Sequence, residues 1–308
     1  MEKPSEQAAL PGAATSSPIE TLADAVRKRR AILFVGAGAS MAVGLPSWDM
    51  LIDHLLEELG LDRNVIQGLN GGYPMLAEFY RLKKRDMASL RDWLDRNWEV
   101  SAERVAGSAL HRLIVELQFP IIYTTNYDRN LEVAFDVHGE RYAKIANARD
   151  VAEAADGVTR IVKYHGDFDD EASLVLTETD FLDRLSFDSP LDIKFRSDAL
   201  GRTILFIGYS MSDPNIRLLL HRIWGTWKRS GYANDRPPSF IFMPERNPVQ
   251  EAVLARWGIK LLTGDPAEPR DDALVKFMGE LKARVYGATQ SDNAPLHNAA
   301  RSGVARRA

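Results

Sequence analysis

The 308-residue sequence contains no cysteine. This absence excludes disulfides, thiolate nucleophiles, iron–sulfur clusters and every structural zinc site that uses cysteine. The sequence also lacks any apolar run near the roughly 18 to 20 residues that a membrane-spanning helix needs, and its start lacks the basic-then-apolar pattern of a secretory signal. We therefore expect a cytoplasmic protein that makes no contact with a membrane.

Neither sign of charge dominates, because 39 Lys and Arg stand against 43 Asp and Glu, for a formal net charge of -4. This slightly acidic balance gives no global electrostatic reason to bind a polyanion, and direct nucleic acid binding is not expected. Hydrophobic residues make up 45% and charged residues 27% of the sequence. These are ordinary values for a globular chain that can bury a large core.

Two end segments carry almost nothing that could join such a core. Residues 1–16 and 287–308 are therefore predicted to be flexible tails. One domain, residues 17–286, lies between them. A helix is expected near its start, where Ser17 reads as a cap, Pro18 as the first helical residue and Glu20 as the third residue after the cap.

Short apolar runs alternate with helical patterns along this domain. The runs are 31–35, 120–124, 161–164, 203–207, 239–243 and 259–262. Strands this apolar on both faces are typical of a parallel sheet that is covered by helices, so we predict a doubly wound, Rossmann-like α/β fold with a mostly parallel sheet. Residues of about 49–117 show only helical patterns and are predicted to form a helical insertion, and a further short strand is predicted at 173–177.

Small, polar and titratable residues follow four of the predicted strands. These groups are Gly36–Ser40, Thr125–Asp128, His165–Asp167 and Gly208–Asp213. Ligands of an open parallel sheet bind beyond the carboxyl ends of its strands, near the point where the strand order reverses. The sequence therefore predicts a ligand site at that edge of the sheet.

Each group also has a purely structural explanation. Gly36 and Gly38 suit a backbone that approaches a pyrophosphate at a helix start, but they equally suit a tight strand-to-helix turn without a ligand. Asn126 is able to cap the next helix, with Asp128 complementing its dipole. Asp213, followed by proline, reads as a helix cap.

His165 is the only one of six histidines at a predicted strand end. An imidazole exchanges protons near neutral pH, which makes this residue a candidate general base. No two histidines have the spacing of metal ligands and no HExxH motif occurs. A metal site is therefore not expected.

Taken together, the motifs resemble the sirtuin-like (silent-information-regulator-like) NAD-binding family, and within it the bacterial NADase branch of antiphage defence. The matching pieces, in the order of the family, are GAGAS (36–40), GLPSW (44–48), TTNYD (124–128), KYHGD (163–167) and GYSMSDPN (208–215). The sequence departs from protein-deacetylating sirtuins in lacking their four zinc-binding cysteines, and in having Thr125 where those enzymes have glutamine.

The resemblance implies that residues 17–286 form a sirtuin-like catalytic domain that takes NAD as its substrate. It further implies that Asn126 and Asp128 bind the nicotinamide end of NAD and that His165 is the general base. The other residues implied to contact NAD are Gly36, Ala37, Gly38, Ser40, Pro46, Trp48, Thr125, Tyr127, Gly208, Ser210 and Ser212.

The implied activity is that of an NAD glycohydrolase, which releases nicotinamide and ADP-ribose and depletes cellular NAD during abortive infection. No sensor domain is evident, so we expect control by homo-oligomerisation or by a partner such as a HerA-type ATPase or an Argonaute-like protein. Three alternatives stay open: a catalytically silent subunit that senses NAD or ADP-ribose, a zinc-free NAD-dependent protein deacylase, and a structural subunit of a nucleoprotein complex. The aromatic residues of the insertion, which either form a self-association surface or fill the insertion's own core, are Tyr73, Phe79, Tyr80, Trp93 and Trp98.

Overall fold

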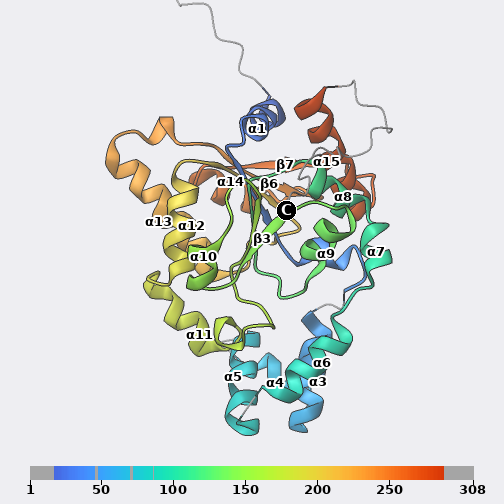
Figure 1. Cartoon of the computed structure of the whole chain (residues 1–308). Helices are drawn as coiled ribbons and strands as arrows, with labels where there is room; N and C mark the ends of the chain where they lie inside the picture. Colours follow the sequence, from blue (N-terminus) through green and yellow to red (C-terminus); the bar gives the residue numbers. More distant parts are fainter. Residues whose placement is uncertain (1–16, 46–47, 70–71, 86, 288–308) are drawn as a thin grey trace, which may run out of the picture.

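A single seven-stranded, all-parallel sheet forms the centre of the molecule in the computed structural model (Figure 1). The structure describes residues 17–45, 48–69, 72–85 and 87–287. The tail predicted at 1–16 lies outside the described residues, as does that at 287–308 except for Gly287. The strands are β1 (Ala31–Val35), β2 (Ile121–Thr124), β3 (Tyr142–Ile145), β4 (Thr159–Lys163), β5 (Thr203–Ile207), β6 (Ser239–Met243) and β7 (Ile259–Thr263), in the order β3-β4-β2-β1-β5-β6-β7.

The predicted doubly wound α/β fold is confirmed, and all six predicted apolar runs are strands. Two local expectations differ from the structure. β3 was not predicted, because its residues YAKI are mostly half-buried and it pairs only with β4, so it lacks the apolar signal of a central strand. The strand predicted at 173–177 is absent. There the Val175 N–H donates to the carbonyl of His165, and the Val175 carbonyl accepts a hydrogen bond from the Tyr127 hydroxyl. These backbone groups are therefore bonded within loops and do not join the sheet.

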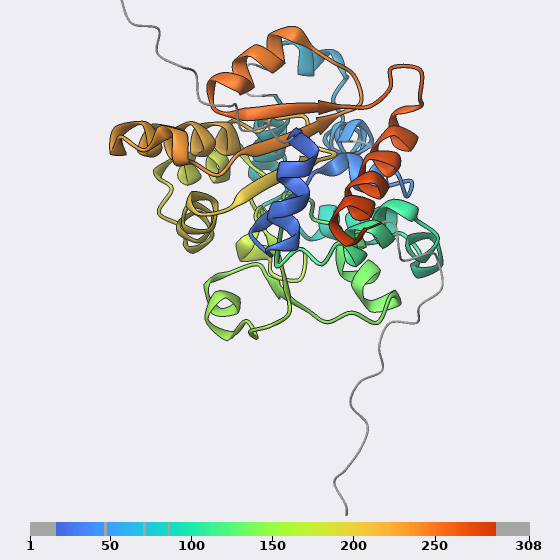
Figure 2. The same cartoon turned by 90° about the horizontal axis from the view of Figure 1, so that it is seen from above.

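Helices cover both faces of the sheet. One face is packed by α1 (Pro18–Arg27), α8 (Ala109–Glu116), α9 (Asn130–Val137) and α15 (Arg270–Tyr286), and α1 lies beside α15 (Figures 1 and 2). The opposite face is packed by α12 (Pro190–Leu200), α13 (Pro214–Ser230) and α14 (Pro248–Arg256), with α10 (Ala148–Glu153) beside β3. Along β1, Leu33 and Val35 face the first layer and Ile32 and Phe34 the second. This two-residue alternation buries every side chain of the strand.

The predicted helical insertion is present between β1 and β2. It contains α3 (Trp48–Leu59), α4 (Asn64–Gln67), α5 (Gly72–Lys84), α6 (Ala88–Asn97), α7 (Ala102–Ala106) and α8, after the short α2 (Ala37–Met41). Helices α3, α5 and α6 form a third apolar cluster, whereas α7 and α8 pack against the sheet.

The aromatic residues of the insertion divide between its core and its surface. Tyr80 and Trp98 are buried, and Trp93 is half-buried and stacks on His54 with ring centroids 4.3 Å apart. Tyr73 and Phe79 are exposed. Tyr80, Trp93 and Trp98 therefore help to fill the core of the insertion. Tyr73 and Phe79 lie on its surface, where a partner could contact them.

A buried histidine on α8 gives the fold an acid-sensitive point. The His111 side chain is fully buried, its Nδ1 lies 2.9 Å from Ser108 Oγ, and its Nε2 has no hydrogen-bond partner within the described residues. Burial lowers the pKa of His111 to about 4, although the nearby charge of Asp128 acts in the opposite direction.

We predict that His111→Gln weakens the pH dependence of stability on the acidic side. Because the folded pKa lies below the ordinary value of 6.5, the unfolded chain binds the proton first, and stability falls as the pH drops from 6.5 towards 4. The shift corresponds to roughly 3 kcal/mol in the free energy of unfolding. Urea unfolding at several pH values measures it, and His221→Gln, at an exposed site, serves as the control. An unchanged slope in His111→Gln contradicts this assignment.

Candidate active site

The four groups of polar residues that the sequence singles out converge in the structure. They follow β4, β2, β1 and β5, which are neighbours in the centre of the sheet, and all four strands run in the same direction. The chain moves outward from β1 to β2 and later returns across the sheet to β5, so the strand order reverses beside β1. The candidate site therefore lies where doubly wound sheets hold their ligands.

The loops after β1 and β5 touch backbone to backbone. Gly38 N–H donates to the carbonyl of Gly208 at 2.9 Å, and a Cβ added to Gly36 would lie 2.4 Å from the same oxygen. Gly208 has a φ of +58°, and a Cβ there would lie 2.6 Å from Ala39 N. This close packing alone requires glycine at these positions. A role for them beside a pyrophosphate stays a prediction.

Ser40, Asn126 and Asp128 form one hydrogen-bonded unit between the loops after β1 and β2. Ser40 Oγ donates to Asp128 Oδ2 at 2.8 Å, and Asn126 Nδ2 donates to Ser40 Oγ at 3.0 Å and to the Gly36 carbonyl at 3.1 Å. The capping explanation for Asn126 is wrong, because α9 begins at Asn130 and the Asn126 amide points to the loop after β1 instead.

Asp128 does interact with the start of α9, as its structural explanation proposed. Its Oδ1 accepts the N–H of Asn130 at 3.0 Å while its Oδ2 binds Ser40. Behind it, the fully buried Lys163 donates to the Asp128 carbonyl and lies 3.4 Å from Glu132 Oε1. Burial raises the pKa of Glu132, while the charge of Lys163 opposes the rise. Lys163 belongs to the KYHGD motif, but no sequence signal connected it to the loop after β2.

Tyr127 has a packing role in the structure. It is buried, its hydroxyl donates to the Val175 carbonyl at 2.6 Å, and its ring lies 5.4 Å from that of Phe168. Tyr127 also belongs to the apolar cluster of the insertion. The loop after β2 therefore fastens the insertion to the carboxyl edge of the sheet.

The remaining predicted residues are placed to different degrees. Ala37 opens α2, and Thr125 is half-buried after β2. Ser210 and Ser212 are exposed, with their Oγ atoms 2.8 Å apart. Trp48 begins α3, but only its backbone is described, and Pro46 lies outside the described residues.

His165 is buried at the end of β4 and meets a residue that the sequence had assigned only to helix capping. Its Nε2 lies 3.1 Å from Asp213 Oδ2, an ion-pair distance without the alignment of a formed hydrogen bond. The capping role of Asp213 is confirmed, since the carboxylate also accepts the N–H groups of Asn215 and Ile216. Burial acts to raise the pKa of Asp213, but His165 and these N–H donors outweigh it and lower the pKa below the ordinary value.

The segment between His165 and β5 is held by a buried ionic network. It contains α11 (Glu178–Asp183) and two 3-10 helices, η1 (Glu171–Ser173) and η2 (Arg184–Ser186), before α12. Arg184 donates to the Tyr164 carbonyl at 2.6 Å and pairs with Asp192, which also accepts the hydroxyls of Tyr164 and Ser189. This network fixes the backbone directly before His165.

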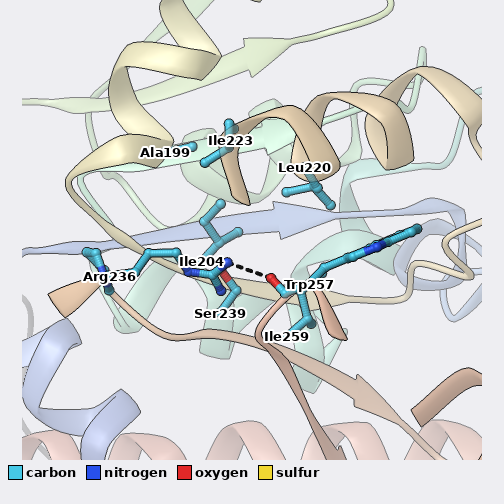
Figure 3. A pocket seen from close by; sticks show the side chains of 9 residues that line it. Ala199, Ile204, Leu220, Ile223, Arg236, Ser239, Trp257 and Ile259 are labelled. Carbon is cyan, nitrogen blue, oxygen red and sulfur yellow. Dashed lines mark hydrogen bonds between the residues drawn. The ribbon is translucent and has the colours of Figure 1, made fainter. Parts of the chain in front are cut away.

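Two hollows of the described surface lie away from this edge. One, with a volume of about 10 Å³, lies at the opposite ends of β5, β6 and β7, where Arg236 donates to the Trp257 carbonyl (Figure 3). The other, of about 330 Å³, lies between α10 and α12. Across the described residues, no group of three or more His, Cys, Asp or Glu side chains is arranged to hold a metal ion, and no helix is long and apolar enough to cross a membrane.

The structure defines a doubly wound α/β protein with a polar edge at the reversal of strand order, which is where such sheets hold their ligands. Comparison with known families makes this class specific: residues 120–262 match the family described as "SIR2-like domain". This part of the chain is therefore similar to a SIR2-like domain.

Characterised relatives fall in the branch that the motifs indicated. The chain is 32% identical to NAD(+) hydrolase ThsA of Enterococcus faecium, over 67% of this chain and 42% of that protein. It is 30% identical to NAD(+) hydrolase ThsA of Bacillus cereus (strain MSX-D12), over 72% of this chain and 45% of that protein. It is 25% identical to Defense-associated sirtuin 2 of Bacillus subtilis, over 77% of this chain and 23% of that protein. The chain thus spans less than half the length of these relatives.

We predict that Gly208→Ala disrupts the contact between the loops after β1 and β5. The added Cβ meets backbone atoms that cannot move independently, and the positive φ adds strain, so the free energy of unfolding should fall by about 2 kcal/mol or more. Gly201→Ala, at the other end of β5, is the matched control because a Cβ there meets nothing within 4 Å. Denaturant unfolding of the two variants measures the difference, and equal stability would contradict the proposed packing.

Proposed function

We propose that this chain is an NAD glycohydrolase, which cleaves NAD to nicotinamide and ADP-ribose. One observation carries the proposal: the unit of Ser40, Asn126 and Asp128 lies at the same sheet edge as His165. The names of the relatives, NAD(+) hydrolase ThsA, support the same chemistry. Because the chain matches only part of those proteins, the activity is proposed for this chain from its own residues.

Cleavage of the N-glycosidic bond passes through a transition state in which positive charge builds on the ribose. Nicotinamide leaves as a neutral molecule, so the protein needs no strong acid. It needs groups that hold the carboxamide and orient the ring. Both side-chain hydrogen bonds of Asn126 within the protein use its Nδ2 atom, and we assign its Oδ1 to the carboxamide N–H group of nicotinamide.

Asp128 acts through its neighbours in this scheme. Each of its carboxylate oxygens already binds a protein donor, one from Ser40 and one from Asn130. Asp128 therefore holds Ser40, and Ser40 in turn holds Asn126. Lys163 anchors the Asp128 backbone from behind. We propose that the loops after β1 and β5 receive the phosphates and the adenosine half, with Ser210 and Ser212 as hydroxyl donors.

His165 is the proposed general base. Its imidazole takes a proton from a ribose hydroxyl or from the water that captures the cation, a step typically worth about 10² to 10⁴-fold in rate. A binding subunit that never turns NAD over has no use for such a group at its ligand edge. The sensing alternative is weaker for this reason.

The proposed biological role is depletion of NAD in the cytoplasm during bacterial antiphage defence. The name of one relative, Defense-associated sirtuin 2, supports this setting. We propose that activity is controlled by assembly, either between copies of the chain or with a partner such as a HerA-type ATPase or an Argonaute-like protein. The exposed Tyr73 and Phe79 of the insertion are the proposed self-association surface.

We predict that Asn126→Ala lowers nicotinamide release from NAD by about 10²-fold or more, because the carboxamide loses its partner. Asn234→Ala, at an exposed position, is the matched control and should keep full activity. The assay uses purified protein with and without its genomic neighbour, and nicotinamide is followed by chromatography.

The sensing subunit and the deacylase, two of the three alternatives, each give a different result in this assay. Absence of release under every oligomeric and partnered condition rules out the glycohydrolase, and NAD binding in that case supports the sensing subunit. Release that requires an acylated peptide identifies a deacylase. Full activity of Asn126→Ala removes Asn126 from the site while leaving the reaction intact.

A further inference from the structure

We propose that Asp213 is a positioning residue that sets which nitrogen of His165 carries the proton. The proposal rests on the proposed function, because it assigns the atom through which His165 acts as a base. It is carried by the contact between His165 Nε2 and Asp213 Oδ2 at 3.1 Å, in which 7% and 10% of the two side chains are exposed. Catalytic pairs in unliganded proteins are often poorly aligned and tighten when substrate binds.

Asp213 is held rigidly by the start of α13. Its Oδ1 accepts the N–H groups of Asn215 at 2.8 Å and Ile216 at 3.3 Å, and Pro214 occupies the first helical position. The helix thus occupies one carboxylate oxygen and aims the other at His165. A residue needed only as a cap does not require a charge, since serine and asparagine cap helices equally well.

Two aromatic rings pack against the imidazole of His165. The ring of Phe181 on α11 meets it edge to face at 5.3 Å, and the ring of Tyr164 lies 5.7 Å away. The Phe181 carbonyl accepts a hydrogen bond from Asn215 Nδ2 at 3.2 Å, so α11 and the start of α13 are joined around the histidine. These contacts keep Nε2 turned towards Asp213.

The proton location follows from hydrogen-bond chemistry. A neutral imidazole carries one N–H, and a carboxylate only accepts, so the pair is favourable when the proton is on Nε2. The lone pair that is able to take a proton is then on Nδ1. When a ribose hydroxyl or a water loses its proton to Nδ1, the O–H bond breaks, the imidazole becomes cationic, and Asp213 keeps its charge and stabilises it.

Asp213→Asn separates positioning from capping. Asparagine keeps an oxygen for the α13 N–H groups but turns an NH₂ donor towards Nε2, which drives the histidine proton to Nδ1 and blocks the base. We expect kcat for nicotinamide release to fall by about 10²-fold or more, with KM changing less than about threefold. Ser17→Ala, which removes the cap of α1, is the control for loss of a cap and should keep full kcat.

The tautomer itself is measured by ¹⁵N NMR of the histidine ring, with the His165 signals identified by their loss in His165→Gln. The expected result is an N–H on Nε2 in the unchanged protein and on Nδ1 in Asp213→Asn. An unchanged tautomer, or a kcat equal to that of the unchanged protein, overturns the proposal. If Asp213→Asn does not fold, Asp213→Ser, which keeps a cap without an NH₂ group, takes its place, and persistence of a pure Nε2–H form then overturns the proposal. The NMR spectra test the position of the His165 proton even if the protein releases no nicotinamide. Failure of this proposal is therefore distinguishable from failure of the proposed function.

Discussion

The hydrogen bond from Gly38 N–H to the Gly208 carbonyl is the contact on which the rest of the site depends. It joins the loop after the first strand to the loop after the fifth, across the reversal of strand order, with no side chain between the two backbones. Ser40 lies in the segment that follows the first strand, and Asp213 lies in the segment that follows the fifth. The segments that carry Ser40 and Asp213 are therefore joined by the main chain, before any side chain contributes.

Charged groups at this edge mostly support other residues. Lys163 holds the Asp128 backbone, Asp128 holds Ser40, and Arg184 holds the Tyr164 carbonyl. Burying such groups is unfavourable unless each finds a partner, so each pair links two segments that would otherwise be independent. In a chain without cysteine, the segment between the fourth and fifth strands is secured in this way, through Asp192 and its three donors.

Local sequence patterns were sufficient to predict the fold and the gathering of the four polar groups at one edge of the sheet. Strands buried on both faces and the polar groups that follow them are visible because each depends on consecutive residues. The edge strand β3 was missed because its residues lack that apolar signal. Residues 173–177 have the signal, but their backbone does not pair as a strand does. The pairing of His165 with Asp213 was not predictable, because it depends on how two loops distant in sequence meet, and a cap-and-proline pattern explained Asp213 without it.

Helix α11 has the insertion on one side and the histidine on the other. Glu78 and Arg81 of α5 bind Thr179 and Asp180, while the next residue, Phe181, presses its ring edge against His165. Phe79, exposed on the surface, belongs to the same turn of α5. A protein that bound that surface would contact α5 beside the residues that hold α11. Helix α11 in turn carries the aromatic ring that packs against the imidazole of His165.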